Sequence, residues 1–359
     1  NKASSPDSPT IKTIILNTLL RKNSCRFMKT KPLTILFDAN PLVNGNKSGV
    51  GYYTLQIIQA LADTYPEDIR LIGHYFSFLG NKDSAELPIA PNIKYVRSRI
   101  IPGKILSLTR ALGFQLPLEL FFKRSGDAAL FTNFVSLPSI TKVPRLVAIH
   151  DLCYIDVPQY VSKKNRDFLL KFVPKSIKTA SKVITISEAT KNSIMNRYEV
   201  SEDRFVITPI PPSINKTDAI YDLKTIGVEG KFILFVSTLE PRKNVINLVK
   251  AYEQLPDNFK KEYQLVLAGG TGWYMEETMA YIKSLQDKGE RIITPGYISD
   301  ECRNSLYKNA SLFVLPSHYE GFGMPILEAM NYGVPTAVSD IPVFHEVAGD
   351  AAVYFDKDD

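Results

Sequence analysis

The sequence has few cysteines, no long apolar run and little excess charge. Cys25, Cys153 and Cys302 are scattered and lack the spacing of a metal site, so we expect a reducing compartment and no disulfide framework. No run of about 18 apolar residues occurs, so we expect no membrane-spanning helix. The net charge of +6, from 43 basic and 37 acidic residues, does not point to nucleic acid. With 45% hydrophobic and 22% charged residues, the composition is that of an ordinary globular protein.

At 359 residues, the chain is long enough for two domains with their own cores. Short apolar runs alternate with helical stretches, which predicts an α/β fold with parallel sheets covered by helices on both faces. We expect a first domain over 32–208, a proline-rich linker over 209–216 and a second domain over 217–359. In the second domain, strands are expected at Phe232–Val236, Gln264–Ala268, Arg291–Ile293, Leu312–Leu315, Thr336–Val338 and Val353–Phe355. Helices are expected there at Val245–Gln254, Met275–Asp287, Asp300–Lys308 and Pro325–Tyr332.

The first 31 residues look foreign to this fold, because they are polar and serine-rich with only a short amphipathic piece. Met28 precedes the first apolar strand and is the expected natural start. A signal peptide is the alternative, but the apolar piece Ile14–Leu20 is short and no small-residue cleavage site follows it. We therefore expect residues 1–31 to be a disordered or non-native extension.

Two glutamates, Glu320 and Glu328, bracket a glycine-rich loop that follows the apolar run 311–315. The pattern predicts a buried strand, a bent loop and a helix beginning at Pro325, since proline is favoured at the first helical position. Free amides at a helix start attract anions, and the loop glycines let a ligand approach the main chain closely. Carboxylates accept hydrogen bonds from hydroxyls, so the arrangement predicts a ligand with a phosphate and several hydroxyls. The alternative is a glycine turn before an ordinary helix, with Glu328 merely complementing the helix dipole.

The string Glu320-Gly-Phe-Gly-Met-Pro-Ile-Leu-Glu328-Ala-Met, with Gly333-Val-Pro after it, resembles the two-glutamate signature of retaining glycosyltransferases of family 4, the glycosyl transferases group 1. The resemblance implies the GT-B fold, in which two Rossmann-like, doubly wound parallel-sheet domains face a cleft. It also implies that the first glutamate contacts the donor sugar, that the second contacts the ribose, and that loop amides hold sugar hydroxyls and diphosphate. The donor-binding residues that it implies in this motif are Gly321, Phe322, Gly323, Met324, Pro325, Leu327 and Glu328.

Arg242 and Lys243 follow the expected strand 232–236 and precede a helix for which Asn244 is a candidate N-cap. Cations are disfavoured beside the positive end of a helix, and an anionic ligand would turn that penalty into an attraction. The planar fork of arginine and the point charge of lysine both suit phosphate. This stretch also resembles the family, which carries its diphosphate-binding basic pair here, although some members have an additional arginine where this chain has Ser237. The alternative is that both residues are solvated surface charges.

The first domain has two further candidate sites, and each follows an expected strand. Gly49 and Gly51 belong to a glycine loop that opens a helix, without the full dinucleotide fingerprint of a Rossmann dehydrogenase. The resemblance implies that they contact the donor phosphate and the reacting centre, and a simple turn is the alternative. His150 and Asp151 follow the expected strand 145–149. The family places a histidine here to stabilise the transition state, whereas a lone histidine at a strand end is otherwise more often structural. Asp151 is a candidate for donor binding, for orienting His150 or for holding an acceptor hydroxyl.

The resemblance also implies roles at the nucleotide base and at the reacting centre. Tyr297 and Ile298 would frame the base, although Tyr297 fits a core or rim position equally. The catalytic residues that the resemblance implies are Glu320, His150, Lys243 and Arg242. No metal-binding cluster of the Asp-x-Asp type presents itself, so we expect no metal, and no cofactor apart from the nucleotide sugar as co-substrate.

The resemblance predicts a retaining hexosyltransferase that moves a sugar from a nucleotide-diphosphate sugar to a glycan or lipid-linked acceptor. The expected pathway is the synthesis of a cell-surface polysaccharide: O-antigen (lipopolysaccharide), capsule or exopolysaccharide. The string Thr238-Leu-Glu-Pro-Arg-Lys-Asn is reminiscent of mannosyltransferases, which makes GDP-mannose a lead for the donor. The alternatives are a non-catalytic nucleotide-sugar-binding partner subunit and a GT-B nucleotide-sugar epimerase or phosphorylase. Family members usually continue beyond the strand 353–355, so we expect the second domain to be truncated at Asp359.

Basic residues gather in the expected helix 163–180 and just beyond it, opposed only by Asp167. They are Lys163, Lys164, Arg166, Lys171, Lys175, Lys178 and Lys182. Such a helix presents either a solvated face or a surface for anionic lipid head groups or a lipid-diphosphate acceptor. We therefore expect a cytoplasmic protein, peripheral on the inner face of the cytoplasmic membrane, with a saccharide or polyprenyl-diphosphate-linked acceptor as partner and no nucleic acid.

Overall fold

The computed structural model describes residues 31–43, 49–76, 87–98, 109, 113–122, 126–211 and 221–358. The expected extension 1–31, apart from its last residue, lies outside the described residues. So do residues 44–48 of the first glycine loop and residues 212–216 of the expected linker.

Contacts between Cα atoms divide the chain into two compact units. The first unit comprises residues 1–150, 164–186 and 190–208, and the second comprises residues 151–163, 187–189 and 209–359. Two short segments that precede the expected linker, 151–163 and 187–189, therefore group with the second unit. The domain boundaries expected from the sequence stay a prediction.

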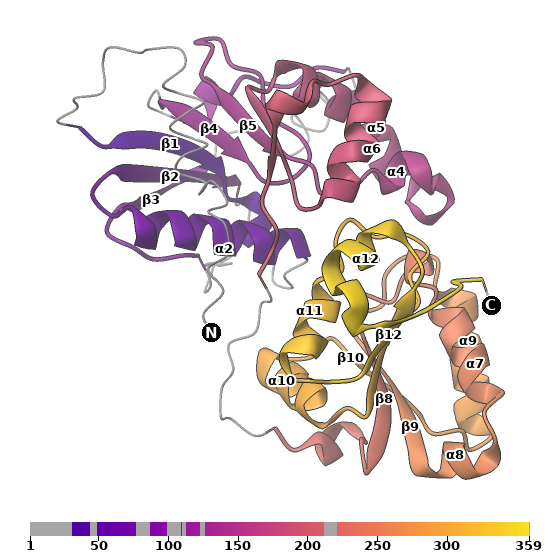
Figure 1. Ribbon diagram of the computed structural model, residues 1–359. Coiled ribbons are helices and arrows are strands. Elements are labelled where there is room, and N and C mark those ends of the chain that lie inside the picture. The colour runs from indigo at the N-terminus through magenta and orange to yellow at the C-terminus, as the bar shows by residue number, and fades with distance from the viewer. Residues whose placement is uncertain are drawn as a thin grey trace. The chain divides into compact units, whose positions relative to one another are not determined.

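The first unit contains a seven-stranded parallel sheet within the described residues, in the order β3-β2-β1-β4-β5-β6-β7 (Figure 1). The strands are β1 (Leu33–Asp38), β2 (Ile69–Phe76), β3 (Ile93–Ser98), β4 (Ala128–Phe131), β5 (Arg145–Ala148), β6 (Lys182–Thr185) and β7 (Phe205–Ile207). The helices are α2 (Gly49–Thr64), α5 (Lys163–Thr179) and α6 (Glu188–Tyr198). The central strands β1, β4 and β5 are mostly buried apolar runs, as expected for a parallel sheet with both faces covered.

The second unit contains a six-stranded parallel sheet within the described residues, in the order β10-β9-β8-β11-β12-β13. The strands are β8 (Lys231–Val236), β9 (Tyr263–Ala268), β10 (Ile292–Gly296), β11 (Leu312–Leu315), β12 (Thr336–Ser339) and β13 (Val353–Phe355). The helices are α4 (Cys153–Asp156), α7 (Val245–Glu253), α8 (Asp257–Glu262), α9 (Glu276–Asp287), α10 (Asp300–Asn309), α11 (Met324–Asn331) and α12 (Pro342–Ala348). All six strands expected here are confirmed, whereas the short helices α4 and α8 were not expected.

Short 3-10 turns connect several of these elements. They are η1 (Asn40–Leu42), η2 (Leu118–Leu120), η3 (Pro158–Tyr160), η4 (Glu202–Arg204), η5 (Leu223–Ile226), η6 (Pro241–Lys243) and η7 (Gly349–Ala351). Among the described helices, none combines the length and the apolar character needed to cross a bilayer.

The order of the strands brings the functional loops of the second unit together. Strand β8 lies between β9 and β11. Strands β9 and β10 follow on one side of β8, and strands β11, β12 and β13 follow on its other side, so the strand order reverses at β8. Ligands of such sheets bind at this switch point, outside the carboxyl ends of the strands. The loop after β8 carries the basic pair and the loop after β11 carries the two-glutamate motif, so both motifs lie at the switch point. The predicted α/β class with doubly wound parallel sheets is confirmed.

Candidate active site

The loop after β8, in the second unit, turns sharply and bears the two cationic residues Arg242 and Lys243. Pro241 opens the 3-10 turn η6, and Asn244 then adopts the left-handed conformation, with φ of 57°. Asn244 directly precedes α7, as expected, but its side chain does not cap that helix. Its amide Nδ2 donates instead to the carbonyl of Lys357, at 2.8 Å. Arg242 and Lys243 are therefore fixed by a rigid turn rather than by a capped helix.

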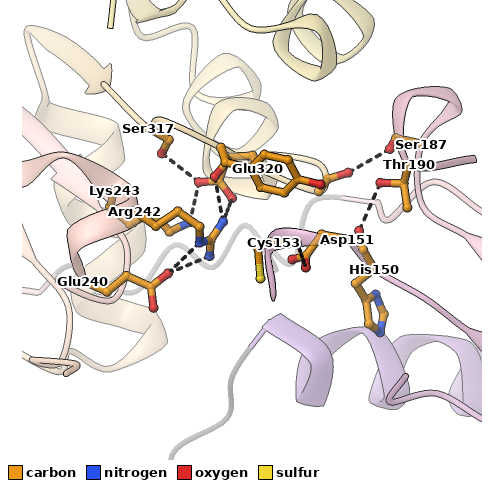
Figure 2. Close-up of polar contacts among 12 residues, drawn as sticks. His150, Asp151, Cys153, Ser187, Thr190, Glu240, Arg242, Lys243, Ser317 and Glu320 are labelled. Carbon is orange, nitrogen blue, oxygen red and sulfur yellow. Dashed lines mark hydrogen bonds and ion pairs between the residues drawn. The ribbon is translucent and has the colours of Figure 1, made fainter. Parts of the chain in front are cut away.

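Glu320 is the centre of the ionic cluster at the switch point (Figure 2). Its Oε2 accepts a hydrogen bond from Arg242 Nη1 at 2.9 Å. Its Oε1 accepts from Lys243 Nζ and, at 2.8 Å, from the hydroxyl of Ser317. One carboxylate thus binds two cations and a hydroxyl that come from the loops after β8 and β11.

Arg242 uses most of its hydrogen-bonding capacity inside this cluster. Its Nε and Nη2 donate to Glu240 Oε1 at 3.1 and 2.6 Å, and its Nη1 also donates to the carbonyl of Tyr319 at 2.8 Å. Together with the bond to Glu320, four of the five hydrogens of the guanidinium are used. Lys243 has a single carboxylate partner among the described residues, which leaves two ammonium hydrogens for a ligand. Arg242 therefore organises the loops, and Lys243 is the better placed cation for a phosphate.

Burial makes these ion pairs strong. The side chains of Arg242, Lys243 and Glu320 are 16%, 10% and 7% exposed. Burial by itself raises the pKa of Glu320, but the charges of Lys243 and Arg242 and the hydrogen bonds from Lys243 and Ser317 outweigh it and lower the pKa to about 2. Burial would lower the pKa of Arg242, yet the neighbouring carboxylates raise it above its ordinary value. The interpretation of Arg242 and Lys243 as solvated surface charges is therefore wrong.

Two residues of this cluster were not anticipated from the sequence. Glu240, 4% exposed, accepts hydrogen bonds from Arg242 within the same loop. Ser317, in the loop after β11, donates to Glu320. The only sequence signal for Glu240 was a carboxylate two positions before an arginine. That spacing is common on surfaces, and burial alone distinguishes this case.

The glycine-rich loop between the glutamates is buried and sharply bent. Gly321 accepts a hydrogen bond through its carbonyl from Ser187, at 2.8 Å. Gly323 has φ of 106° and precedes the first residue of α11, and an added Cβ there would lie 2.8 Å from the ring of Phe344. A left-handed turn in this space requires glycine. The bend directs the chain into α11, which begins at Met324, one residue before the expected start.

The remaining members of the motif lie within or beside the first turns of α11. Phe322 is 7% exposed, and Pro325 occupies the first turn of the helix, where its missing N–H has no partner to lose. Met324 and Leu327 are half-buried. Donor contacts for these residues stay a prediction.

Glu328 is also buried, at 4% exposure, but its partners differ from those of Glu320. Its Oε2 accepts a hydrogen bond from the hydroxyl of Tyr307 at 3.0 Å and lies 3.9 Å from Nε of Arg303. Both partners belong to α10. Glu328 is therefore held by a neighbouring helix, which is more than a helix-dipole role requires, and its contact with a ribose stays a prediction.

A second glycine loop, directly after β9, supports the loop that carries the cations. Gly269 has φ of 145°, and an added Cβ would lie only 1.8 Å from the carbonyl oxygen of Ser237. The amide of Leu239 donates to Gly270, and Leu239 accepts from Gly272, at 2.9 and 2.7 Å. This glycine turn therefore fixes the main chain just before Glu240.

The residues expected at the nucleotide base follow β10, two strands from β8. Tyr297 is 52% exposed, and Ile298 packs partly against the core of the second unit. The exposed ring excludes a core position for Tyr297. Contact with a base stays a prediction.

The imidazole of His150 is buried at the end of β5 in the first unit. Its Nε2 lies 2.7 Å from the carbonyl oxygen of Thr132, so this nitrogen carries a proton, because a carbonyl can only accept. The rings of Tyr53 and Phe134 meet it edge-on, with centroids 4.9 and 5.3 Å away. This environment is compatible with the structural interpretation, and the catalytic role of His150 stays a prediction.

Asp151, the next residue, groups with the second unit. Its Oδ1 accepts a hydrogen bond from the amide of Cys153 at 3.1 Å, and its charge contributes to raising the pKa of Arg242.

Gly49 and Gly51 both lie in the first turn of α2, where Gly49 is exposed and Gly51 is buried. Their contact with a donor phosphate stays a prediction.

The structure thus brings Arg242, Lys243 and Glu320 into direct contact and places Asp151 within electrostatic reach of them. Such a cluster presents a fixed carboxylate for hydroxyls and ammonium hydrogens for an anion. Preorganised donors of this kind stabilise negative charge as it develops on a leaving group.

Comparison with known proteins identifies the family. Residues 222–358 match the family description "Glycosyl transferases group 1". The chain is 34% identical over 346 residues to "O-antigen chain mannosyltransferase B" of Escherichia coli, which covers 91% of this chain and 87% of that protein. The chain belongs to the glycosyl transferases group 1, the retaining glycosyltransferases of family 4. The sequence-based resemblance is confirmed, and neither alternative, the partner subunit or the epimerase, is favoured.

Further relatives and solved structures agree with this result. "O-antigen chain mannosyltransferase RfbU" of Salmonella typhimurium is 28% identical over 316 residues, 87% of this chain and 85% of that protein. Sucrose-phosphate synthase from Thermosynechococcus elongatus superposes with a TM-score of 0.65 at 17% identity, covering 91% of this chain and 87% of that one. WaaG, a glycosyltransferase involved in lipopolysaccharide biosynthesis, superposes with a TM-score of 0.64 at 15% identity, covering 90% and 86%. The predicted GT-B fold is confirmed.

Proposed function

We propose that this retaining glycosyltransferase transfers a mannosyl residue from a nucleotide-diphosphate mannose to a lipid-linked glycan during O-antigen-type polysaccharide synthesis. The observation that carries the proposal is the 34% identity, over nearly the whole chain, to a protein named as an O-antigen chain mannosyltransferase. A second relative with a similar name is 28% identical. GDP-mannose is the first donor to test.

The ionic cluster supports this function chemically. The two ammonium hydrogens of Lys243 that have no partner among the described residues would bind the donor diphosphate, and the carboxylate of Glu320 would accept from sugar hydroxyls. Lys243 would then stabilise the charge that develops on the departing phosphate. That phosphate would take the proton of the acceptor hydroxyl on the same face of the sugar, which retains the anomeric configuration. Glu328 would bind the ribose, and no metal would be needed.

The experiment is a transfer assay with purified protein, a lipid-linked glycan acceptor and a panel of labelled donors: GDP-mannose, UDP-glucose, UDP-galactose and dTDP-rhamnose. We expect label in the lipid fraction from GDP-mannose alone, with the donor's anomeric configuration kept. Glu320→Gln, which keeps the size of the side chain, is the inactive control. Transfer from another donor would refute the mannosyl assignment, and no transfer from any donor would refute the enzyme. Conversion of the donor without acceptor would instead indicate an epimerase.

We also propose that the acceptor is reached at an anionic membrane surface through α5. Its exposed side chains include Lys164, Lys171, Lys175 and Lys178, whose spacing places them on one face of the helix. Lys175 donates to the carbonyl of Gly113 at 3.2 Å, and the next residue, Phe114, is 52% exposed. Each lysine near an anionic bilayer contributes about 1 kcal/mol of binding free energy.

Flotation with vesicles at low salt tests this membrane surface. We expect the protein to float with vesicles that contain anionic lipid and to stay behind with zwitterionic ones. The combined substitution Lys171→Gln, Lys175→Gln and Lys178→Gln would abolish flotation. Lys283→Gln removes an exposed charge from α9 and is the matched control. Equal flotation of both variants would rule out α5 as the contact.

A further inference from the structure

Tyr319, the residue before Glu320, holds a segment that comes from the first half of the sequence. Its hydroxyl accepts a hydrogen bond from the amide of Leu152 at 3.1 Å and donates to Oδ2 of Asp156 at 3.1 Å. Its carbonyl accepts from Arg242 at 2.8 Å. All of these residues group with the second unit. Tyr319 therefore connects the ionic cluster to the segment 151–163 through both its main chain and its side chain.

The phenol bridges the two ends of α4. Leu152 directly precedes the first residue of this helix, and Asp156 is its last residue. A helix of four residues is too short to be stable by itself, so its position depends on contacts made from outside it. Burial and the charge of Asp151 raise the pKa of Tyr319 far above its ordinary value, so the hydroxyl keeps its proton and remains a donor. One hydroxyl thus fixes both ends of α4.

The position of α4 determines the position of Asp151. The carboxylate of Asp151 accepts from the amide of Cys153, the first residue of α4, at 3.1 Å. The charge of Asp151 acts on Arg242 together with those of Glu320 and Glu240. The hydroxyl of Tyr319 thus holds α4, the first residue of α4 holds the carboxylate of Asp151, and the charge of Asp151 acts on the guanidinium of Arg242. Figure 2 shows Asp151 beside Cys153, with Arg242 in the neighbouring ionic cluster.

The far end of the segment has its own attachment. The indole Nε1 of Trp273 donates to the carbonyl of Tyr160 at 2.8 Å, and the ring of Tyr160 stacks on that of His318 at a centroid distance of 5.2 Å. Loss of the Tyr319 hydroxyl would thus loosen α4 locally and leave the rest of the segment in place.

We propose that Tyr319 is a positioning residue for glycosyl transfer: through α4 it holds Asp151 beside Arg242, and it does not itself bind the nucleotide. The proposal rests on the proposed function. Tyr319→Phe removes the hydroxyl and keeps the ring. Tyr281→Phe is the matched control, because the hydroxyl of Tyr281 also donates to a carboxylate, that of Glu253 on α7.

The experiment combines amide hydrogen exchange with kinetics. In Tyr319→Phe, the amide of Leu152 would exchange about tenfold faster than in the wild type, because its hydrogen-bond acceptor is gone. The kcat would fall about tenfold, and the KM for the donor would stay within about twofold. Asp156→Ala would lower kcat less, and would add little in the Tyr319→Phe background, because the two residues share one contact. Tyr281→Phe would change none of these quantities.

Three results would overturn the proposal. Unchanged exchange at Leu152 would show that the hydroxyl does not hold α4. Fast exchange with a wild-type kcat would show that α4 does not matter for transfer. A parallel loss of donor affinity, kcat and thermal stability would indicate a general folding role. Hydrogen exchange is measured on the ligand-free protein and does not depend on transfer activity. A wild type without transfer activity would therefore contradict the proposed function. The exchange rate at Leu152 would still show whether the hydroxyl of Tyr319 holds α4.

Discussion

Replacing Glu320 with glutamine would remove the negative charge that lies between two buried cations. Removing one partner of a buried ion pair typically costs about 3–5 kcal/mol, since the remaining charge is left uncompensated. The pKa gives a second estimate: it is lowered from 4.5 to about 2. A shift of about 2.5 units at 1.36 kcal/mol per unit corresponds to roughly 3 kcal/mol. We therefore expect Glu320→Gln to destabilise the second unit by about 3 kcal/mol.

The lowered pKa of Glu320 also determines how the stability of the second unit depends on pH. The pKa of Glu320 is lowered in the folded state, so its contribution is fully present above about pH 4.5 and is lost as the pH falls toward 2. The variant has no carboxylate to titrate, so the difference in stability between the wild type and the variant would shrink over that range.

The single tryptophan makes the assay specific for one unit. Trp273 is the only tryptophan of the chain and lies in the second unit, so its fluorescence reports the unfolding of that unit. Urea unfolding followed by this signal would give the loss in free energy of unfolding. Glu262→Gln is the control, because Glu262 pairs with Lys231 at the surface, where both side chains are more than half exposed. We expect that control to change stability by about 0.5 kcal/mol or less.

A double variant separates charge pairing from packing. In Glu320→Gln with Lys243→Met, one uncompensated cation is removed together with the carboxylate, so the combined loss should be at least about 1 kcal/mol smaller than the sum of the single losses. Additive losses, or a loss in Glu320→Gln as small as that in the surface control, would refute the ion-pair reasoning.

Three further predictions concern other sites. Burial lowers the pKa of His74 from 6.5 to about 4, so the first unit should lose about 3 kcal/mol of stability as the pH falls from 6.5 to 4. An NMR titration that finds the pKa of His74 near its ordinary value would contradict this. Gly269→Ala should lower the free energy of unfolding of the second unit by more than about 2 kcal/mol, because the added Cβ would collide with Ser237. In the same urea unfolding assay, the control Gly289→Ala should cost about 1 kcal/mol, since Gly289 has a positive φ but open space around it. Glu328→Gln should weaken nucleoside-diphosphate binding about tenfold in calorimetry with a smaller effect on kcat, and unchanged affinity would argue against the ribose contact.

Most strands of the fold could be predicted because their sequence signal is local. The six strands of the second unit are short apolar runs bounded by polar or glycine residues. Five of them are found within one residue of the expected bounds, and β10 runs three residues beyond its expected end. The helices α4 and α8 were missed, since they have four and six residues and are too short to show a helical period. The grouping of 151–163 with the second unit was also missed, because it depends on contacts such as that between Leu152 and Tyr319, 167 positions apart.

The sequence by itself determined the family, the fold class and the residue types that follow each strand, because these depend on patterns within a few consecutive residues. Only the tertiary structure decided which of these residues are partners. It paired Glu320 with Arg242 and Lys243, 78 and 77 positions away, by placing β11 next to β8 in the sheet. It also showed that Arg242 is committed to Glu240, Tyr319 and Glu320, which leaves Lys243 better placed for a ligand. Strand order and burial set these distances, and neither is written in the spacing of the residues along the chain.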